Sequence, residues 1–126
     1  MMRAALVLAA LLGAGSAAAQ DAQAAYRLGL MHRNGVGVAQ DAQRAAALIE
    51  AAAKGQVPAA MFTLSNMLAS GEGMARDEAG ARRWLEAAAG LGYPAALQQL
   101  ALTEPDPRKA DLLMRQAAHA LQHTAP

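Results

Sequence analysis

Two consecutive stretches of 36 residues decide the fold that this sequence predicts. Residues 22–57 read AQAAYRLGLMHRNGVGVAQDAQRAAALIEAAAKGQV, and residues 58–93 read PAAMFTLSNMLASGEGMARDEAGARRWLEAAAGLGY. The same residue types recur 36 positions apart: Ala24 and Ala60, Leu28 and Leu64, Gly35 and Gly71, Gly37 and Gly73, Asp41 and Asp77. A third copy begins with Ala96 and Leu100, but its Asp106 aligns with Asp41 only if seven residues, the Gly-x-Gly loop included, are deleted. Self-similarity at a fixed period predicts a repeat architecture, here of two full units and one clipped unit.

Each unit has the residue order of a helical hairpin. The segment 34–37 ends the first helix of unit 1, because its glycines tolerate the positive φ of a helix-ending turn. Asp41 is placed to cap a second helix that runs to about Lys54, where Gly55 ends it, and Pro58 suits the first turn of the next helix. The same order recurs with Gly71, Gly73, Asp77, Gly92 and Pro94, and in the third copy with Asp106 and Pro107. Helical spacing predicts one core-facing stripe on the first helix: Ala24, Ala25, Leu28, Met31 and His32.

These hairpins predict an all-α fold, an α-solenoid. The 126 residues are 55% hydrophobic but only 3% aromatic, and their many alanines favour helices. One hairpin cannot bury its own apolar face, so we expect the copies to stack into a right-handed superhelix. Two and a half units are few for a repeat array, which predicts either a partner that covers one end or a homodimer.

The first 19 residues have the layout of a secretory signal peptide. A short basic start (1–3), an apolar run (4–12) and a stretch of small residues (13–19) precede Gln20. The apolar run is shorter than the ~20 residues that span a bilayer, and Gly13 and Gly15 are expected to interrupt its helix. We therefore expect a cleaved signal at 1–19 and a repeat domain at 20–126. The mature chain should lie in the periplasm or outside the cell, with no membrane insertion after cleavage.

Charge and cysteine content exclude several classes of function. The chain has 11 Lys and Arg against 10 Asp and Glu, and removing residues 1–19 takes away Arg3 and no acid, which leaves 10 against 10. Nucleic acids and anionic membranes are bound by a basic excess, so neither is expected as a partner. With no cysteine, the chain has no disulfide, no thiolate metal site and no thiol nucleophile.

The pattern A-x3-L-G-x2-[aromatic]-x2-G-x-G-V-x2-D-x3-A-x2-W-x3-A-A-x2-G resembles the Sel1-like repeat, a relative of the tetratricopeptide repeat. Unit 1 carries it in Ala24, Leu28, Gly29, Gly35, Gly37, Val38, Asp41, Ala45, Ala51, Ala52 and Gly55, and unit 2 in Ala60, Leu64, Gly71, Gly73, Asp77, Ala81, Trp84, Ala88, Ala89 and Gly92. The departures are Ser65 for the helix-packing glycine, Met74 for the valine, and His32 and Leu68 for the aromatic. The units cover about 22–57, 58–94 and 95–122.

The resemblance implies an interaction scaffold whose partner varies from one member to another. Some exported, cysteine-rich relatives are associated with β-lactam binding or hydrolysis, but they rely on disulfides that this chain lacks. Others are envelope adaptors, polymer-export factors or immunity proteins against secreted toxins.

The residues that differ between copies are the best candidates for binding a partner. On the first helix of unit 1, Gln23, Tyr26, Leu30 and Arg33 point away from the predicted core stripe, toward the concave surface that solenoids use for binding. Tyr26 and Phe62 are two of the four aromatics and lie one repeat apart. Rigid aromatic rings beside polar groups suit a peptide-binding groove, although rings at this position can instead pack on the neighbouring helix. The predicted partner-binding set is Gln23, Tyr26, Arg27, Leu30, Phe62, Thr63, Asn66, Gln98, Gln99 and Leu102.

Other motifs have structural explanations. The glycine loops lack the Lys-Ser/Thr of a P-loop and follow no strand, and the aspartates at the caps recur with the repeat. His32 is expected to be a packed imidazole with one hydrogen-bonded nitrogen, and Trp84 a core residue. His119 and His123 lie four apart near the C-terminus, with no acid or thiolate to complete a metal site. We therefore predict no catalytic, cofactor-binding or metal-binding residues.

The sequence thus favours a non-catalytic interaction module or adaptor of the bacterial cell envelope, which binds a protein or peptide on its concave face. The alternatives are a β-lactam-binding or β-lactam-hydrolysing enzyme and an immunity protein that neutralises a secreted toxin.

Overall fold

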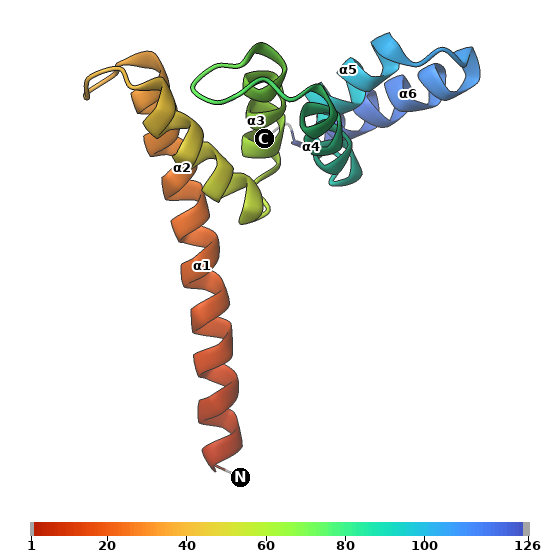
Figure 1. Ribbon diagram of the computed structural model, residues 1–126. Helices are drawn as coiled ribbons and strands as arrows, with labels where there is room; N and C mark the ends of the chain where they lie inside the picture. The colour runs from red at the N-terminus through yellow and green to blue at the C-terminus, as the bar shows by residue number, and fades with distance from the viewer. Residues whose placement is uncertain (1, 125–126) are drawn as a thin grey trace.

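The computed structural model describes residues 2–124, with side chains described for 17–123. Over these residues the chain forms six helices and no strand: α1 (Met2–Asn34), α2 (Ala42–Lys54), α3 (Pro58–Ser70), α4 (Glu78–Gly90), α5 (Pro94–Thr103) and α6 (Pro107–Thr124). Consecutive helices pair as hairpins, and the hairpins stack in a row, with α1–α2 at one end and α5–α6 at the other (Figure 1). The all-α solenoid prediction is confirmed.

Three aspartates cap the second helices, as the repeated spacing predicts. Asp41 accepts a hydrogen bond from the backbone N–H of Arg44 (3.0 Å), and Asp77 accepts one from Gly80 (2.9 Å). Asp106 accepts the N–H of Arg108 at 2.9 Å. Each aspartate satisfies a donor that the first turn of a helix leaves free, so the cap sets where α2, α4 and α6 begin.

In the turn between hairpins 1 and 2, Gly55 ends α2 as predicted. Gly55 follows the last residue of α2, but its φ is −80°, and the left-handed residue is Gln56 at φ +67°. Gly55 is needed for space instead, since a Cβ there would lie 2.5 Å from the methyl group of Ala22. In hairpin 2 the left-handed residue is Gly92, 36 positions after Gln56.

The position of the helix-packing glycine is used in two ways. In α1, Gly29 is buried against α2, and a Cβ there would approach Cγ1 of Ile49 to 2.7 Å. In α3 the same position is Ser65, which is 2% exposed and donates a hydrogen bond to the carbonyl of Ala81 at 2.8 Å. The serine hydroxyl therefore bridges α3 and α4 where the glycine of hairpin 1 permits direct contact.

The core runs through all three hairpins and is densest around α3. Ile49, Leu64 and Met67 are its largest fully buried side chains. Trp84 is half-buried and packs against this cluster, so its ring covers the core rather than filling it. α3 is the helix with hairpins on both sides, which explains why burial concentrates there.

The predicted core stripe of α1 is wrong for three of its five residues. Ala25 and His32 are half-buried, but Ala24, Leu28 and Met31 are exposed. Their counterparts 36 positions on are 0%, 1% and 0% exposed: Ala60, Leu64 and Met67. The preceding hairpin covers that stripe in α3, and within residues 2–124 no hairpin precedes α1.

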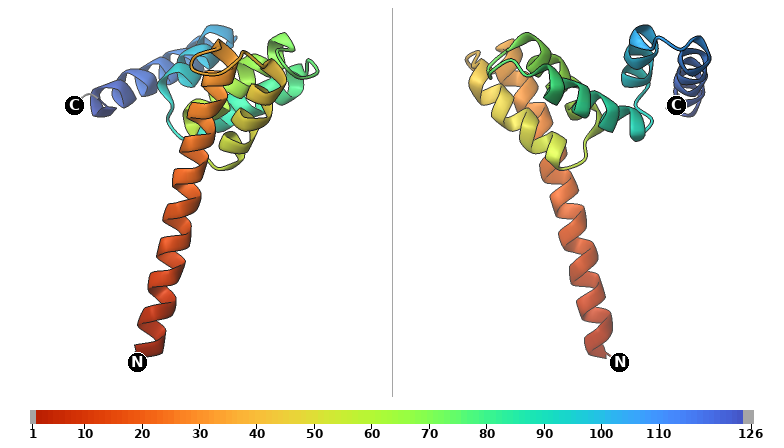
Figure 2. Two further views of the ribbon diagram at one scale, coloured as in Figure 1. Left: turned by 90° about the vertical axis from the view of Figure 1, so that its left-hand side faces the viewer. Right: turned by 45° about the vertical axis from the view of Figure 1, so that its right-hand side comes forward.

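The N-terminal half of α1 is the second correction. The helix is continuous from Met2 to Asn34, so Gly13 and Gly15 do not interrupt it. A glycine costs only about 1 kcal/mol in a helix interior, and the alanine-rich flanks sustain the helix. In every view this half extends beyond α2 and away from the other helices (Figure 2).

The predicted signal peptide, residues 1–19, falls in this region. Residue 1 and the side chains of 2–16 lie outside the described part of the chain, and the signal stays a prediction. Within residues 2–124, no helix combines the length and the hydropathy needed to cross a membrane.

Candidate functional site

The predicted partner-binding residues divide into three groups by exposure. Gln23, Arg27, Gln98 and Leu102 are exposed, and Leu102 is 83% exposed. Half-buried members of the set are Tyr26, Leu30, Phe62, Asn66 and Gln99. Thr63 is buried, with 8% of its surface exposed, and is not a surface residue. Only part of the predicted row is therefore open to a partner.

Tyr26 connects hairpin 1 to hairpin 2. Its hydroxyl lies 3.1 Å from the hydroxyl oxygen of Thr63 on α3, and its ring packs against the core. The side of α1 that carries Tyr26 and Leu30 therefore faces the next hairpin rather than open solvent.

Phe62 makes the corresponding connection between hairpins 2 and 3. Its ring centroid lies 5.5 Å from that of Tyr93, with the ring planes inclined by 55°, a favourable arrangement for two aromatic rings. Burial raises the pKa of Tyr93, and the nearby hydroxyl of Tyr26 raises it further. Phe62 and Tyr93 thus form an aromatic pair between α3 and the start of α5.

Tyr93 is the site residue that the sequence analysis missed. It directly precedes Pro94 at the position that Val57 occupies one unit earlier, where Val57 is buried. That register indicates a packing residue. The replacement of the aliphatic Val57 by a tyrosine in the next unit is the sequence feature that could have pointed to Tyr93.

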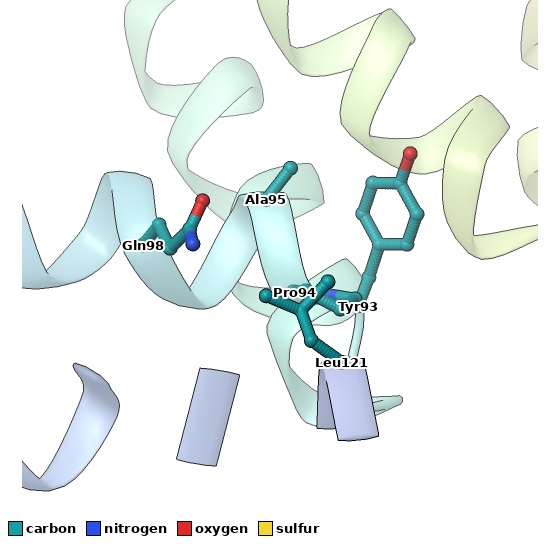
Figure 3. Close-up of a pocket in the computed structure, with 5 residues that line it drawn as sticks. All are labelled: Tyr93, Pro94, Ala95, Gln98 and Leu121. Atoms are coloured by element: carbon teal, nitrogen blue, oxygen red, sulfur yellow. The ribbon is translucent and has the colours of Figure 1, made fainter. Parts of the chain in front are cut away.

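A shallow pocket of about 420 Å³ adjoins Tyr93. Pro94, Ala95 and Leu121 line it between Tyr93 and the amide of Gln98 (Figure 3). Gln98 has the same register as Phe62 and Tyr26, which stand 36 and 72 positions before it. The pocket therefore lies beside the Phe62–Tyr93 pair, at the third position of the row. Its walls suit an apolar side chain, and the amide can bond to a peptide backbone.

An ion pair joins hairpin 1 to the loop of hairpin 2. Arg33 donates two hydrogen bonds to the carboxylate of Glu72, from Nε at 2.9 Å and from a terminal nitrogen at 3.0 Å. These bonds lower the pKa of Glu72 and raise that of Arg33, in both cases against the smaller effect of burial. Arg33, expected in the concave row, is thus engaged within the chain.

The histidines occupy two separate places. His32 is half-buried, and its Nδ1 is buried without a hydrogen-bond partner among the described residues. The rings of His119 and His123 contact each other edge to face with centroids 4.4 Å apart. Among the described residues, no three His, Cys, Asp or Glu side chains gather as metal ligands would.

Known proteins resemble the two full hairpins. The Sel1 repeat pattern matches residues 22–56 and 58–93, more than half of the chain. The chain belongs to the Sel1 repeat family. Such repeats are typically protein-interaction modules, and their fold is generally a non-enzymatic scaffold.

Two solved structures show the same fold. A Sel1 repeat protein from Oxalobacter formigenes superposes with a TM-score of 0.75 at 25% identity, over 79% of this chain and 43% of that chain. A protective antigen present in uropathogenic Escherichia coli strains, which displays an SLR fold, superposes with a TM-score of 0.70 at 30% identity. That match covers 78% of this chain and 22% of the antigen, so this Sel1 repeat chain spans less than half the length of either relative. No curated protein matches the sequence.

Proposed function

We propose that this Sel1 repeat chain is a non-catalytic adaptor of the bacterial cell envelope that binds an extended peptide segment of a partner protein. The peptide lies along the row of first helices and places one apolar side chain in the pocket beside Tyr93. Residues 1–19, as an export signal cleaved before Gln20, supply the envelope location in this proposal.

The observation that carries the proposal is the pocket beside Gln98. Its lining is mostly apolar with one amide, the composition that peptide-binding sites use to take a side chain and a backbone group together. Arg27 and Gln23 remain exposed at the other end of the row, where they can bond to a peptide that continues beyond the pocket.

The structure changes the choice of test variant. Replacing Tyr26 and Phe62 by alanine would remove rings that pack against the core, so lost binding could reflect lost stability. Ala95 is a better site, because it lines the pocket on α5 and is half-buried. Ala95→Phe fills the pocket and removes no core contact. Ala79→Phe is the matched control, on an exposed position of α4.

The experiment is affinity capture from an envelope extract of the native host, followed by calorimetry with peptides from whatever is retained. We expect the parent chain and Ala79→Phe to retain the same protein, and Ala95→Phe to lose it while keeping its helical circular-dichroism signal. Equal retention by all three folded proteins would remove the pocket from the proposal. Mass spectrometry of the secreted or periplasmic chain tests the location, with Gln20 expected as its first residue.

A further inference from the structure

The two ends of the solenoid each expose one half of an interface that the chain makes internally. Inside the chain, each hairpin packs its second helix against the first helix of the next, α2 on α3 and α4 on α5. Within residues 2–124, hairpin 1 is the first and hairpin 3 the last. The residues at these two ends show what is left uncovered.

The stripe that the preceding hairpin covers is exposed on α1. Leu28 and Met31 are each 36% exposed, whereas their counterparts Leu64 and Met67 are 1% and 0% exposed. Ala24 is also exposed. We call these three residues, Ala24, Leu28 and Met31, the α1 end face. In α1 and α3 alike the helix has its own second helix, so the missing predecessor accounts for the difference.

A stripe that is largely buried on α2 and α4 is exposed on α6. The residues eight positions after the three capping aspartates are equivalent in register. They are Ile49, Leu85 and Met114, and they are 0%, 6% and 47% exposed. Twelve residues after it, Ala53 is buried, Ala89 is half-buried and Ala118 is exposed. We call Met114 and Ala118 the α6 end face.

The register of α6 is the same as that of the other second helices. Eleven residues after the cap, Ala52, Ala88 and Ala117 are 0%, 0% and 1% exposed, so α6 turns the same side inward as α2 and α4. The exposure of Met114 is therefore not caused by a rotation of α6. Leu85, the counterpart of Met114, lines the same hollow as Gln99 and Thr103 of the following α5. Within residues 2–124, no further hairpin lies beside Met114 in this way.

We propose that copies of this chain associate head to tail, with the α6 end face of one copy packed on the α1 end face of the next. The contact continues the interface between hairpins, which the chain forms between α2 and α3 and between α4 and α5. The two faces lie at opposite ends of the row of hairpins (Figure 1), so they cannot meet within one chain. Because the two faces differ, the contact is heterologous and propagates into oligomers longer than a dimer.

Electrostatics do not oppose this contact. The full chain has a net charge of only +1, and low net charge favours association. On α6, Asp111 and Arg115 flank Met114 and form an ion pair with each other at 2.6 Å. The charges of Asp111 and Arg115, at the rim of the α6 end face, therefore cancel each other.

Sedimentation velocity of the full chain over a range of concentrations tests the proposal, with Met31→Glu and Met114→Glu altering one face each. Each substitution places an unpaired carboxylate in the contact, so each is expected to weaken association by at least ~10-fold. Leu112→Glu is the matched control. It is 56% exposed on α6, at a position that is exposed in all three hairpins, and it should associate like the parent.

Mixing the two face variants tests the direction of the contact. Met31→Glu keeps an intact α6 end face and Met114→Glu keeps an intact α1 end face, so an equimolar mixture should form heterodimers that stop at two chains. A parent that stays monomeric, variants that associate like the parent, or a mixture that stays monomeric would each overturn the proposal. If Met31→Glu loses its helical signal, Ala24→Glu replaces it on the same face. If the end faces bind only a Sel1 hairpin of another protein, the parent chain will stay monomeric, and the proposal fails.

Discussion

At the scale of single residues, the loop glycines Gly37 and Gly73 allow two costs to be compared. Alanine at either position strains the backbone, but only at Gly73 does it also disturb the packing between hairpins. Both have positive φ, +76° and +72°. A Cβ on Gly73 would overlap the backbone carbonyl of Ala42, whereas on Gly37 it would meet only the end of the Met31 side chain at 3.3 Å. Gly37→Ala should destabilise the fold by roughly 1–2 kcal/mol, the cost of a left-handed alanine.

Gly73→Ala should cost clearly more, because the loop must also move off α2. Urea unfolding of both variants, followed by circular dichroism, measures the difference. Equal losses of stability would mean that the loop of hairpin 2 does not press on α2.

The ion pair between Arg33 and Glu72 should make the contact between hairpins pH-dependent. The pKa of Glu72 is lower in the folded chain than its ordinary value of 4.5. Its contribution is therefore present above pH 4.5 and is lost as pH falls through the lower, folded pKa. Both side chains are about a third exposed, so the pair is worth at most about 1 kcal/mol.

Glu72→Gln should lower the free energy of unfolding at pH 7, and this deficit should be smaller at pH 3, below the ordinary pKa of a glutamate. Glu50→Gln is the control, because Glu50 pairs with Lys54 within α2 and spans no hairpin boundary. Urea unfolding at both pH values decides. A Glu72→Gln deficit that persists unchanged at pH 3 would rule out the ion pair as its origin.

At the scale of helices, the ends were predictable from the sequence and the faces were not. Asp41 and Pro58 act on their own first turns, so the spacing alone places the helix starts. Burial depends on neighbours: Leu28 and Leu64 have the same register and residue type, yet one is exposed and the other buried. Tyr26 shows the same limit, since its helical position indicates a side of α1 but not that Thr63 covers that side.

The uneven burial of the helices predicts uneven protection from hydrogen exchange. α3 has hairpins on both sides and buries six residues: Ala60, Met61, Thr63, Leu64, Ser65 and Met67. In the described part of α6, Ala117 alone is buried. Amides of α3 should exchange through global unfolding, and those of α6 through local opening at lower free energy. Native-state exchange read by mass spectrometry should show this order, and similar protection in both helices would contradict it.

At the scale of the whole molecule, stability should grow with the number of hairpin contacts. In a solenoid each unit touches only its neighbours, so the free energy of unfolding is close to a sum over units and the interfaces between them. Inserting a second copy of residues 58–93 between Tyr93 and Pro94 adds one full hairpin and one interface. Within that interface the added Leu64 and Met67 would cover the face of α4 that carries Leu85, as α5 does in the parent. The insertion should therefore raise both the thermal midpoint and the urea m-value, because more surface is buried.

The control is the same insertion with its copy of Leu64 changed to Ser. That side chain is 1% exposed in the parent, and removing its apolar surface from the new interface should cancel much of the gain, by about 2–5 kcal/mol on the scale of large-to-small core substitutions. Differential scanning calorimetry compares the three chains at equal concentration, below the onset of head-to-tail association. An unchanged thermal midpoint for the unmodified insertion would mean that hairpin contacts are not additive. The ends of this solenoid would then be capped by something other than another hairpin. A rise that the serine copy abolishes would instead show that α4 accepts a further first helix, the same kind of surface that α6 presents through Met114.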